Sequence, residues 1–512
     1  GAGKTRALIE LALSLLSGEA TGEPCDPGAL VAITFTERAA AELEERLRAA
    51  VAGRALAAAG EEAALWRRRL HGLERMTVGT IHAFAAALLR EHPVEAGLDP
   101  EFEVLDEDAS DALRREAARE AALAAAEGEG AARVLLAAHG AGGRRGGLAE
   151  LLADLVRRRA SLGLAGAPEP APADPAAGPG AREALLGAAE SVLARRGAAR
   201  TASGRRAVEA LERALGALAP ADRTGPLDLP AARRLARVAE ALRGWRAGKG
   251  EPPDLAAARA RLSRAGETVV PAVAGALAVP QARALCLLVA RAEEGYARRK
   301  AARAALDFDD LLVRARDLLR ADAGVRAEVR ARTRALLVDE HQDVNRVQQE
   351  VFDLLAGGDL PGPLLVAVGD LKQSIYRFRG ADVTVFAGLL SRLDSEPGGR
   401  VLRLARNHRS APAVLDLVNA VLERAAPGAG ARPYEVGFGG ADRLVPAREA
   451  GPAPACEVLA GGGGGLAPER RAREARALAA RIRALVSGEA GVTVSDRRGG
   501  QPRPPRLGEV AV

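Results

Sequence analysis

Two adjacent carboxylates, Asp339 and Glu340, follow a short apolar run in the stretch Leu336–Asp343, which reads LLVDEHQD. Such a run is typical of a buried strand in a parallel sheet, and ligands of these sheets bind beyond the carboxyl ends of the strands. At that edge Asp339 is suited to hold Mg²⁺, and Glu340 to orient and deprotonate an attacking water. Gln342 can reach both the γ-phosphate region and the neighbouring loops. The pattern predicts one half of a Mg²⁺-nucleotide site.

The sequence begins with residues that suit the other half of this site. Residues 1–5 read GAGKT, the end of the phosphate-loop pattern G-x-x-x-x-G-K-[ST]. In that pattern the backbone of Gly1, Ala2 and Gly3 turns onto the phosphates, Lys4 reaches the β- and γ-phosphates, and Thr5 ligates Mg²⁺ together with Asp339. The residues that follow predict an amphipathic helix that stops at Gly18. A chance G-K-T is the alternative, and a helix in the right place argues against it.

Two later polar residues also follow apolar runs. Gln373 comes after the predicted strand Leu364–Gly369, where it can contact the γ-phosphate. A further strand is predicted to begin at Val401–Leu404, and the turn after it carries Arg409, a candidate arginine finger in a second domain. Asp339, Glu340, Gln373 and Arg409 are therefore the catalytic candidates.

Hydroxyl and ring-bearing residues lie near the ends of other β-rich runs. Thr34 and Thr36, at the end of the predicted strand Leu30–Thr34, are suited to grip a phosphate backbone. Capping of the next helix explains Thr36 equally well. His82 and Phe84 follow a second run, where an aromatic ring can stack on a base, although a lone histidine in such a place is more often structural.

The loop after Gln373 alternates aromatic and cationic residues: Tyr376, Arg377, Phe378 and Arg379. This alternation suits single-stranded nucleic acid, because the rings stack on bases and the arginines contact phosphates. Aromatic core packing with arginines at its edge is the alternative, but so polar a loop offers little core.

Composition bounds the class of protein. The chain has 512 residues, 48% hydrophobic and 27% charged, as in soluble globular proteins, and this length predicts about two to four domains. The net charge of +6 permits a polyanionic partner but is weak evidence alone. Three scattered cysteines fit no disulfide framework and indicate a reducing, cytoplasmic compartment. We expect no membrane span, because prolines interrupt the most apolar stretch, Val269–Ala290, which predicts a buried helix pair.

The distribution of strand-like and helical runs along the sequence predicts three domains. Residues 1–105 and 305–395 carry the strand-like runs and form one domain, residues 106–304 are an inserted helical domain, and residues 396–512 begin another domain. Arginine runs in the insertion, such as Arg157–Arg159, are expected to be solvated faces, with a DNA-facing surface as the alternative. Asp309 and Asp310 precede a helix whose first turn they would favour electrostatically, a role as well supported as catalysis.

Taken together, these motifs resemble a known family. GAGKT, AITFTERAAAELEERL, GTIHAF, LLVDEHQD, VGDLKQSIYRFRGAD and NHRS resemble, in this order, motifs I, Ia, Ic, II, III and IV of UvrD/Rep-type superfamily-1 DNA helicases. Lys372 before the glutamine, Phe378 where these enzymes usually carry tryptophan, DFDDLL before motif II and the long helical insertion look like the RecB/AddA branch. The resemblance covers about residues 1–106 and 306–410.

The resemblance implies an α/β fold: a RecA-like parallel-sheet P-loop NTPase domain (1A) with an all-α insertion (1B) and part of a second RecA-like domain (2A). It implies an ATP- and Mg²⁺-dependent translocase that moves 3′→5′ on single-stranded DNA and unwinds duplex DNA, with a possible nuclease or helicase partner subunit in recombination and double-strand-break repair. Residues 36, 82, 84, 376 and 378 match positions on the DNA side. His408 departs from the usual aromatic of motif IV. The front of motif I and motifs V and VI are expected outside these residues, so we expect this fragment to turn over poorly by itself.

Three other functions remain compatible with these motifs. The first is a stand-alone UvrD-like repair helicase, whereas a downstream nuclease motif with clustered cysteines would select the motor of a helicase–nuclease. A non-catalytic DNA-binding scaffold with a helicase fold is disfavoured by intact Lys4, Asp339, Glu340, Gln373 and Arg409. A generic P-loop ATPase or kinase has no use for the aromatic and basic loop.

Overall fold

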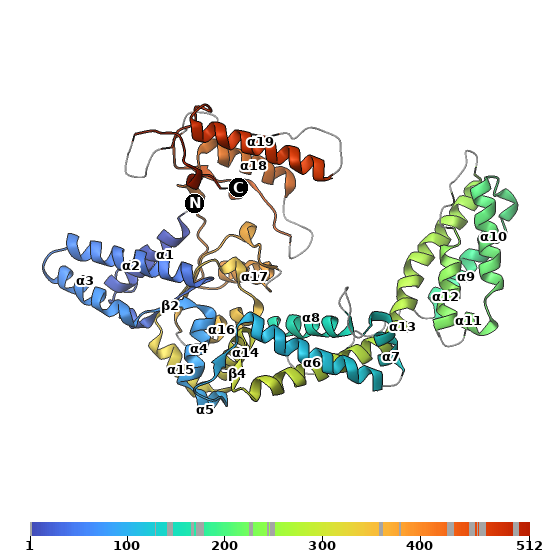
Figure 1. Cartoon of the computed structure of the whole chain (residues 1–512), viewed down its shortest axis with the longest axis horizontal. Coiled ribbons are helices and arrows are strands. Elements are labelled where there is room, and N and C mark those ends of the chain that lie inside the picture. The colour runs from blue at the N-terminus through green and yellow to red at the C-terminus, as the bar shows by residue number, and fades with distance from the viewer. Residues whose placement is uncertain are drawn as a thin grey trace. The chain divides into compact units, whose positions relative to one another are not determined.

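The computed structural model describes residues 3–127, 130–140, 147–164, 168–169, 179–224, 229–242, 245, 251–357, 362–377, 380–426, 435–449, 456–457, 459, 467–494 and 501–511. The chain divides into two compact units. The first unit comprises residues 1–97 and 311–512, and the second comprises residues 98–310. Figure 1 shows the sheet-bearing part at the two ends of the colour range and the helices of the second unit in cyan to yellow-green.

A four-stranded parallel sheet organises the first unit. Its strands are β1 (Leu30–Thr34), β2 (Thr77–Thr80), β5 (Ala335–Val338) and β6 (Leu364–Ala367), in the order β2-β1-β5-β6. β1 is buried along its whole length, and so is β5, as expected for strands covered on both faces. Since all four strands run the same way, their carboxyl ends meet at one edge. Pairing continues past β5, where the Asp339 amide donates to the Ile33 carbonyl over 2.9 Å.

Helices that precede, separate and follow these strands along the sequence complete the first unit. They are α1 (Lys4–Ser17), α2 (Glu37–Ala57), α3 (Gly60–Gly72), α4 (Ile81–Glu91), α5 (Pro93–Ala96), α15 (Ala323–Arg332), α16 (Arg346–Ala356), α17 (Val383–Ser395), α18 (Pro412–Ala425) and α19 (Ala467–Ser487), with α14 (Phe308–Ala321) beginning in the second unit. Short 3₁₀ turns are η1 (Pro27–Ala29), η2 (Leu73–Arg75), η5 (His341–Asp343), η6 (Leu371–Gln373), η8 (Gly440–Asp442) and η9 (Leu507–Glu509). Leu8, Leu15 and Leu16 of α1 pack with Leu30 and Leu337 in one core, which anchors α1 to the sheet.

The predicted strand beginning at Val401–Leu404 does not form. Residues 401–405 lack regular structure, and a two-residue strand, β7 (Arg406–Asn407), pairs instead with β8 (Val445–Pro446) in parallel. Leu402 is 85% exposed and so has no apolar layer to pack against, which removes the main stabilisation of a strand.

Within its described residues, the second unit is helical apart from a two-stranded parallel pair, β3 (Glu103–Val104) with β4 (Ala305–Leu306). Its helices are α6 (Glu107–Glu127), α7 (Ala131–His139), α8 (Leu148–Ser161), α9 (Pro179–Leu193), α10 (Ala202–Gly216), α11 (Pro220–Thr224), α12 (Leu229–Glu240) and α13 (Pro253–Ala301), with the 3₁₀ turn η4 (Arg196–Ala198). No helix in the described ranges is long and apolar enough to cross a membrane.

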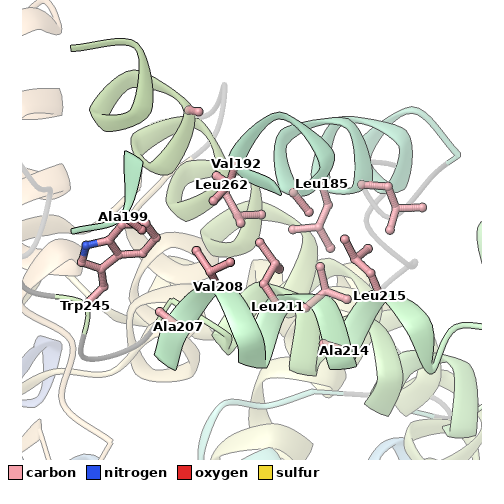
Figure 2. Close-up of a cluster of buried hydrophobic side chains, with 14 of the residues drawn as sticks. Leu185, Val192, Ala199, Ala207, Val208, Leu211, Ala214, Leu215, Trp245 and Leu262 are labelled. Atoms are coloured by element: carbon pink, nitrogen blue, oxygen red, sulfur yellow. The ribbon is translucent and has the colours of Figure 1, made fainter. Parts of the chain in front are cut away.

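The prediction of a helix pair over Val269–Ala290 is wrong. One helix, α13, runs unbroken for 49 residues and contains Pro271 and Pro280 in its interior. An interior proline costs a helix about 3 kcal/mol, so packing must stabilise the helix elsewhere. Both ends of α13 are packed. Leu288 and Val289 join a core with α6 and α8, while Leu255 and Leu262 join a second core with α9, α10 and α12. Figure 2 shows side chains of this second core pointing into the space between the helices, among them Val192, Val208, Leu211 and Leu262.

Candidate functional site

The phosphate-loop residues lie at the carboxyl edge of the sheet, beside the two carboxylates. Gly1 and Ala2 lie outside the described residues. Gly3 caps α1 in the left-handed region (φ +84°), and an added Cβ there would meet no atom within 4 Å, which leaves its backbone open to a ligand. Lys4 Nζ donates to Glu340 Oε2 over 2.7 Å, and Thr5 Oγ1 donates to Asp339 Oδ2 over 3.4 Å. Residues more than 330 positions apart thus meet in one site.

The two carboxylates differ in electrostatic state. Burial raises the pKa of Asp339, and the neighbouring Glu340 charge adds to this effect. Burial also raises the pKa of Glu340, but hydrogen bonds from Lys4 and Gln342 outweigh it and hold that pKa below its usual value. Glu340 also has a positive φ of 50°, a conformation that a non-glycine residue adopts only at a cost in free energy. Glu340 is therefore ionised, which is the protonation state that a general base requires.

Gln342 connects the carboxylates to the loop after β6. Its amide nitrogen donates to Glu340 Oε2 over 2.8 Å, and its amide oxygen accepts from the Asp370 backbone over 2.8 Å. An added Cβ on Gly369 would lie 2.8 Å from this amide oxygen and 2.7 Å from the Phe386 ring. Only glycine therefore allows the β6 loop to approach Gln342 so closely.

Gln373 and Arg409 do not touch the carboxylates. Gln373 Nε2 donates to Asp370 Oδ2 over 2.8 Å, so its side chain is held by its own loop. Arg409 is exposed on the turn after β7, where its backbone N–H donates to Asn407. Both residues line one large cleft of about 2470 Å³ in the first unit, whose walls also include Gly3, Lys4, Thr5 and Glu340. A cleft of this size has room for a nucleotide with its metal ion.

The threonines predicted to grip DNA have structural partners. Thr34 is 3% exposed and its hydroxyl donates to the Thr36 carbonyl over 3.0 Å. Thr36 caps α2, since its hydroxyl accepts from the Ala39 amide over 3.1 Å. The capping alternative accounts for Thr36, and a role in DNA binding remains a prediction for both residues.

The ring-bearing candidates lie in two places. His82 and Phe84 are half-buried at the start of α4, and burial lowers the pKa of His82 to about 4, so the ring is neutral at neutral pH. Tyr376 stacks on Phe35, with ring centroids 4.7 Å apart and an interplanar angle of 26°. Arg377 is exposed, whereas Phe378 and Arg379 lie outside the described residues.

With this geometry in place, the comparisons with known proteins decide the family. A model of the UvrD/REP helicase N-terminal domain matches residues 1–393, more than half of the chain. The chain belongs to the UvrD/REP helicase family. The predicted family is thus confirmed, and so is the α/β class with a parallel, RecA-like sheet.

Curated relatives refine this assignment. The chain is 31% identical over 517 residues to an ATP-dependent helicase/nuclease subunit of Desulforudis audaxviator, covering 90% of this chain and 41% of the relative. It is 32% identical over 534 residues to the protein of the same name from Moorella thermoacetica, covering 90% and 36%. The protein of that name from Staphylococcus aureus is 35% identical over 150 residues, 28% of this chain and 12% of the relative. The chain thus spans about two fifths of the length of the first two relatives.

Two residues of this UvrD/REP-family site were missed in the sequence. Phe35 lies inside the AITFTERAAAELEERL motif, but its ring contact with Tyr376 depends on a loop far along the chain. His341, inside the DEHQD pattern, is fully buried against Phe386 with ring centroids 5.1 Å apart, and burial lowers its pKa to about 4. Its polar neighbours, Glu340 and Gln342, give no sequence signal that this ring is buried.

The second unit holds a buried ionic cluster that includes Asp310, one of the two acids expected to favour the first turn of the helix after them. Lys300 Nζ lies 3.1 Å from Asp307 Oδ2 and also pairs with Asp310. Tyr296 donates to the same Asp307 oxygen over 2.6 Å, and its ring lies 4.2 Å below the Lys300 ammonium. Asp307 caps α14 by accepting from the Asp310 amide, and the Asp310 carboxylate accepts from the Asp307 amide in return and also pairs with Lys300.

One further group of possible metal ligands occurs among the described residues: Glu91, His92 and Glu328 place ligand atoms within 4.8 Å of one another. The Arg332 guanidinium already pairs with the Glu91 carboxylate and lowers its pKa. A cation thus occupies this site, and we assign no metal to it.

Proposed function

We propose that the chain is the ATP-driven motor of a 3′→5′ DNA helicase, acting with a nuclease in recombination and double-strand-break repair. The meeting of Lys4, Thr5, Asp339 and Glu340 at the carboxyl edge of the sheet supports an ATPase. The Phe35–Tyr376 stack on loops from β1 and β6 supports a single-strand-binding surface beside it. Relatives named as helicase/nuclease subunits support a DNA substrate and a partner subunit.

Each residue has a proposed role in hydrolysis. Thr5 and Asp339 would hold Mg²⁺, which neutralises charge on the phosphates, and the open turn at Gly3 with Lys4 would bind the phosphates themselves. Glu340, released from Lys4, orients and deprotonates the attacking water. Gln373 and the Arg409 guanidinium, which line the same cleft, contact the γ-phosphate.

The coupling to DNA follows from where the loops begin. The loop bearing Phe35 leaves β1, and the loop bearing Gln373 and Tyr376 leaves β6, so both carry DNA-side rings on segments that also end at the ATP site. A change at Gln373 is therefore transmitted to Tyr376 through the two residues between them in the same loop. In this proposal residues 1–105 and 305–395 are domain 1A, residues 106–304 are domain 1B, and residues 396–512 begin domain 2A.

A charge asymmetry favours contact between the insertion and duplex DNA. Residues 179–267, the bundle around the core of Figure 2, contain seventeen Lys and Arg against ten Asp and Glu, a formal +7, whereas the whole chain carries +6. Several of the acids are already paired, such as Asp222 with Arg234 and Asp254 with Arg195. Exposed arginines without a carboxylate partner among the described residues include Arg206, Arg213 and Arg237.

The main test is Glu340→Gln in the complete gene product. We expect wild-type ATP hydrolysis to be stimulated by single-stranded DNA, and the variant to lose about 10²-fold or more in kcat while nucleotide binding persists, because only proton abstraction is removed. Hydrolysis at an equal rate without DNA would contradict the translocase. Absence of hydrolysis in the wild type, with DNA binding intact, would support the scaffold alternative.

The duplex contact has its own test. Changing Arg206, Arg213 and Arg237 together to Gln should weaken duplex binding and reduce the slope of log affinity against log salt by about 2–3, since each neutralised phosphate contributes about 0.9 to that slope. Affinity for single-stranded DNA is the internal control and should not change. Equal losses for both DNA forms would show that the bundle acts only through non-specific charge.

A further inference from the structure

Lys372 and Asp370 have no role in the hydrolysis scheme above, yet they lie between Gln373 and residues 396–512. Asp370 Oδ2 accepts from Gln373 Nε2 over 2.8 Å, and Asp370 Oδ1 lies 3.2 Å from Lys372 Nζ. The Gln373 bond and the Lys372 charge outweigh burial and lower the pKa of Asp370, so this carboxylate is ionised at neutral pH. The glutamine that should contact the γ-phosphate is thus held by a charged neighbour.

Lys372 also reaches beyond its own loop. Its ammonium lies 3.5 Å from Asp442 Oδ1, on the 3₁₀ turn η8 between α18 and β8. Asp442 is fixed there by the Gly439 amide, which donates to its other oxygen over 3.0 Å. Lys372, Asp370 and Asp442 are each about three-quarters buried, so this bridge is better shielded from solvent than an ordinary surface pair.

The same loop is joined to the carboxylates from the other side. The Asp370 backbone N–H donates to Gln342, which in turn donates to Glu340, the partner of Lys4. Hydrogen bonds therefore run without a break from the phosphate-loop lysine through Gln342 to Asp370, and from Asp370 through Lys372 to Asp442. Groups that would contact ATP satisfy one another in this arrangement.

We propose that Asp370 and Lys372 are positioning residues that hold Gln373 back from the nucleotide, and that the Lys372–Asp442 bridge makes this hold depend on residues 396–512. The inference rests on the proposed ATPase function of the same site. Movement of η8 away from Lys372 would remove the contact that anchors this loop to residues 396–512, so that the loop could turn and carry Gln373 toward the γ-phosphate. The bridge then suppresses hydrolysis until residues 396–512 move.

The test is a double-mutant cycle with Lys372→Met and Asp442→Asn in the complete gene product, with ATP turnover measured with and without single-stranded DNA. Each single variant should raise DNA-free kcat about fivefold, the low end of measured coupling between sites, and lower the DNA stimulation ratio accordingly. The double variant should match the single variants, because both break one bridge. Lys372→Arg should retain wild-type behaviour.

Arg403→Met is the matched control, because Arg403 lies 3.7 Å from the same Asp442 oxygen and belongs to a different loop. It should leave DNA-free turnover at the wild-type level. Hydrogen exchange of the amides at 371–374 gives a second readout, which should rise in Lys372→Met without nucleotide.

The outcomes separate the two proposals. Unchanged turnover and exchange in Lys372→Met, or additive effects in the double variant, would contradict the proposed role of the Lys372–Asp442 bridge. Glu340-dependent hydrolysis in the wild type would still support the proposed ATPase function. Lack of any Glu340-dependent hydrolysis in the wild type overturns both.

Discussion

The chain contains two polar networks of similar chemistry, one at the carboxyl edge of the sheet and one around Lys300 in the second unit. The first joins Lys4 to Glu340, 336 positions away, whereas the second joins Lys300 to Asp307 and Asp310, 7 and 10 positions away. They differ in exposure: the Lys4 and Glu340 side chains are 17% and 40% exposed, whereas those of Lys300 and Asp307 are 10% and 4% exposed. Water and ligands can therefore replace the partners of the first pair but not those of the second.

The two networks also differ in the groups to which their members bond. Lys4, Glu340 and Gln373 bond to groups that a nucleotide would replace, and they surround a cleft. The Lys300 ammonium is enclosed by Asp307, Asp310 and the face of the Tyr296 ring. The first network is suited to exchange partners during a reaction cycle, and the second to hold α13 and the start of α14 in one geometry.

Lys300→Met should give the largest stability effect. Removing the ammonium leaves Asp307 and Asp310 buried without their main counter-charge, and breaking a buried pair costs about 3–5 kcal/mol. Native-state hydrogen exchange of the last turns of α13 and the first turns of α14 measures this loss.

Lys4→Met is the matched control for that variant, because its pair with Glu340 is partly solvated and should contribute less than about 1 kcal/mol. It should abolish nucleotide binding while leaving exchange of the sheet nearly unchanged. Equal stability losses in the two variants would remove the distinction between the networks.

The sequence predicted the first network far better than the second. Leu30–Thr34 and the helix ending before Gly18 were located to the residue, because apolar runs ending in glycine or polar residues are local signals. Asp339 and Glu340 were recognisable from their place after such a run. The contact of Lys300 with Asp310 depends on the turn that joins α13 to β4 and α14, and no periodicity encodes it. The unbroken α13 depends likewise on cores at its two ends.

Asp309→Asn should give the next largest effect, as a function of pH. Burial, and then the nearby Asp307 charge, raise the pKa of Asp309 to about 6 from its ordinary 3.8. The folded state therefore opposes ionisation of Asp309, so its contribution favours folding below about pH 4 and is lost as pH rises to 6. The variant should exceed wild type in free energy of unfolding by about 1–3 kcal/mol at pH 7 and match it at pH 4.

Urea unfolding of both proteins across this pH range, followed by hydrogen exchange in the second unit, checks the prediction. Asp307, whose pKa is lowered, is present in both proteins, so its opposite contribution largely cancels in the difference. A difference that is constant from pH 4 to 7 would mean that Asp309 is not held protonated by its surroundings.

The smallest expected effect concerns backbone strain, which both regions contain. Glu340 and Ala304 have φ of 50° and 45°, the positive values of non-glycine residues among those described. Ala304→Gly should stabilise the second unit by about 0.5–1 kcal/mol, because the left-handed conformation costs a non-glycine residue about 1–2 kcal/mol and glycine recovers part of it.

Glu340→Gly should exceed Glu340→Ala in stability by a similar amount, and both should lose hydrolysis. Urea unfolding of the four proteins, with ATP turnover beside it, separates the two cases: strain at Ala304 can be relieved without loss of activity, whereas the residue that carries the strain at position 340 is also the proposed base. Equal stabilities of Glu340→Ala and Glu340→Gly would mean that the left-handed backbone at position 340 costs a non-glycine residue little free energy in the folded state.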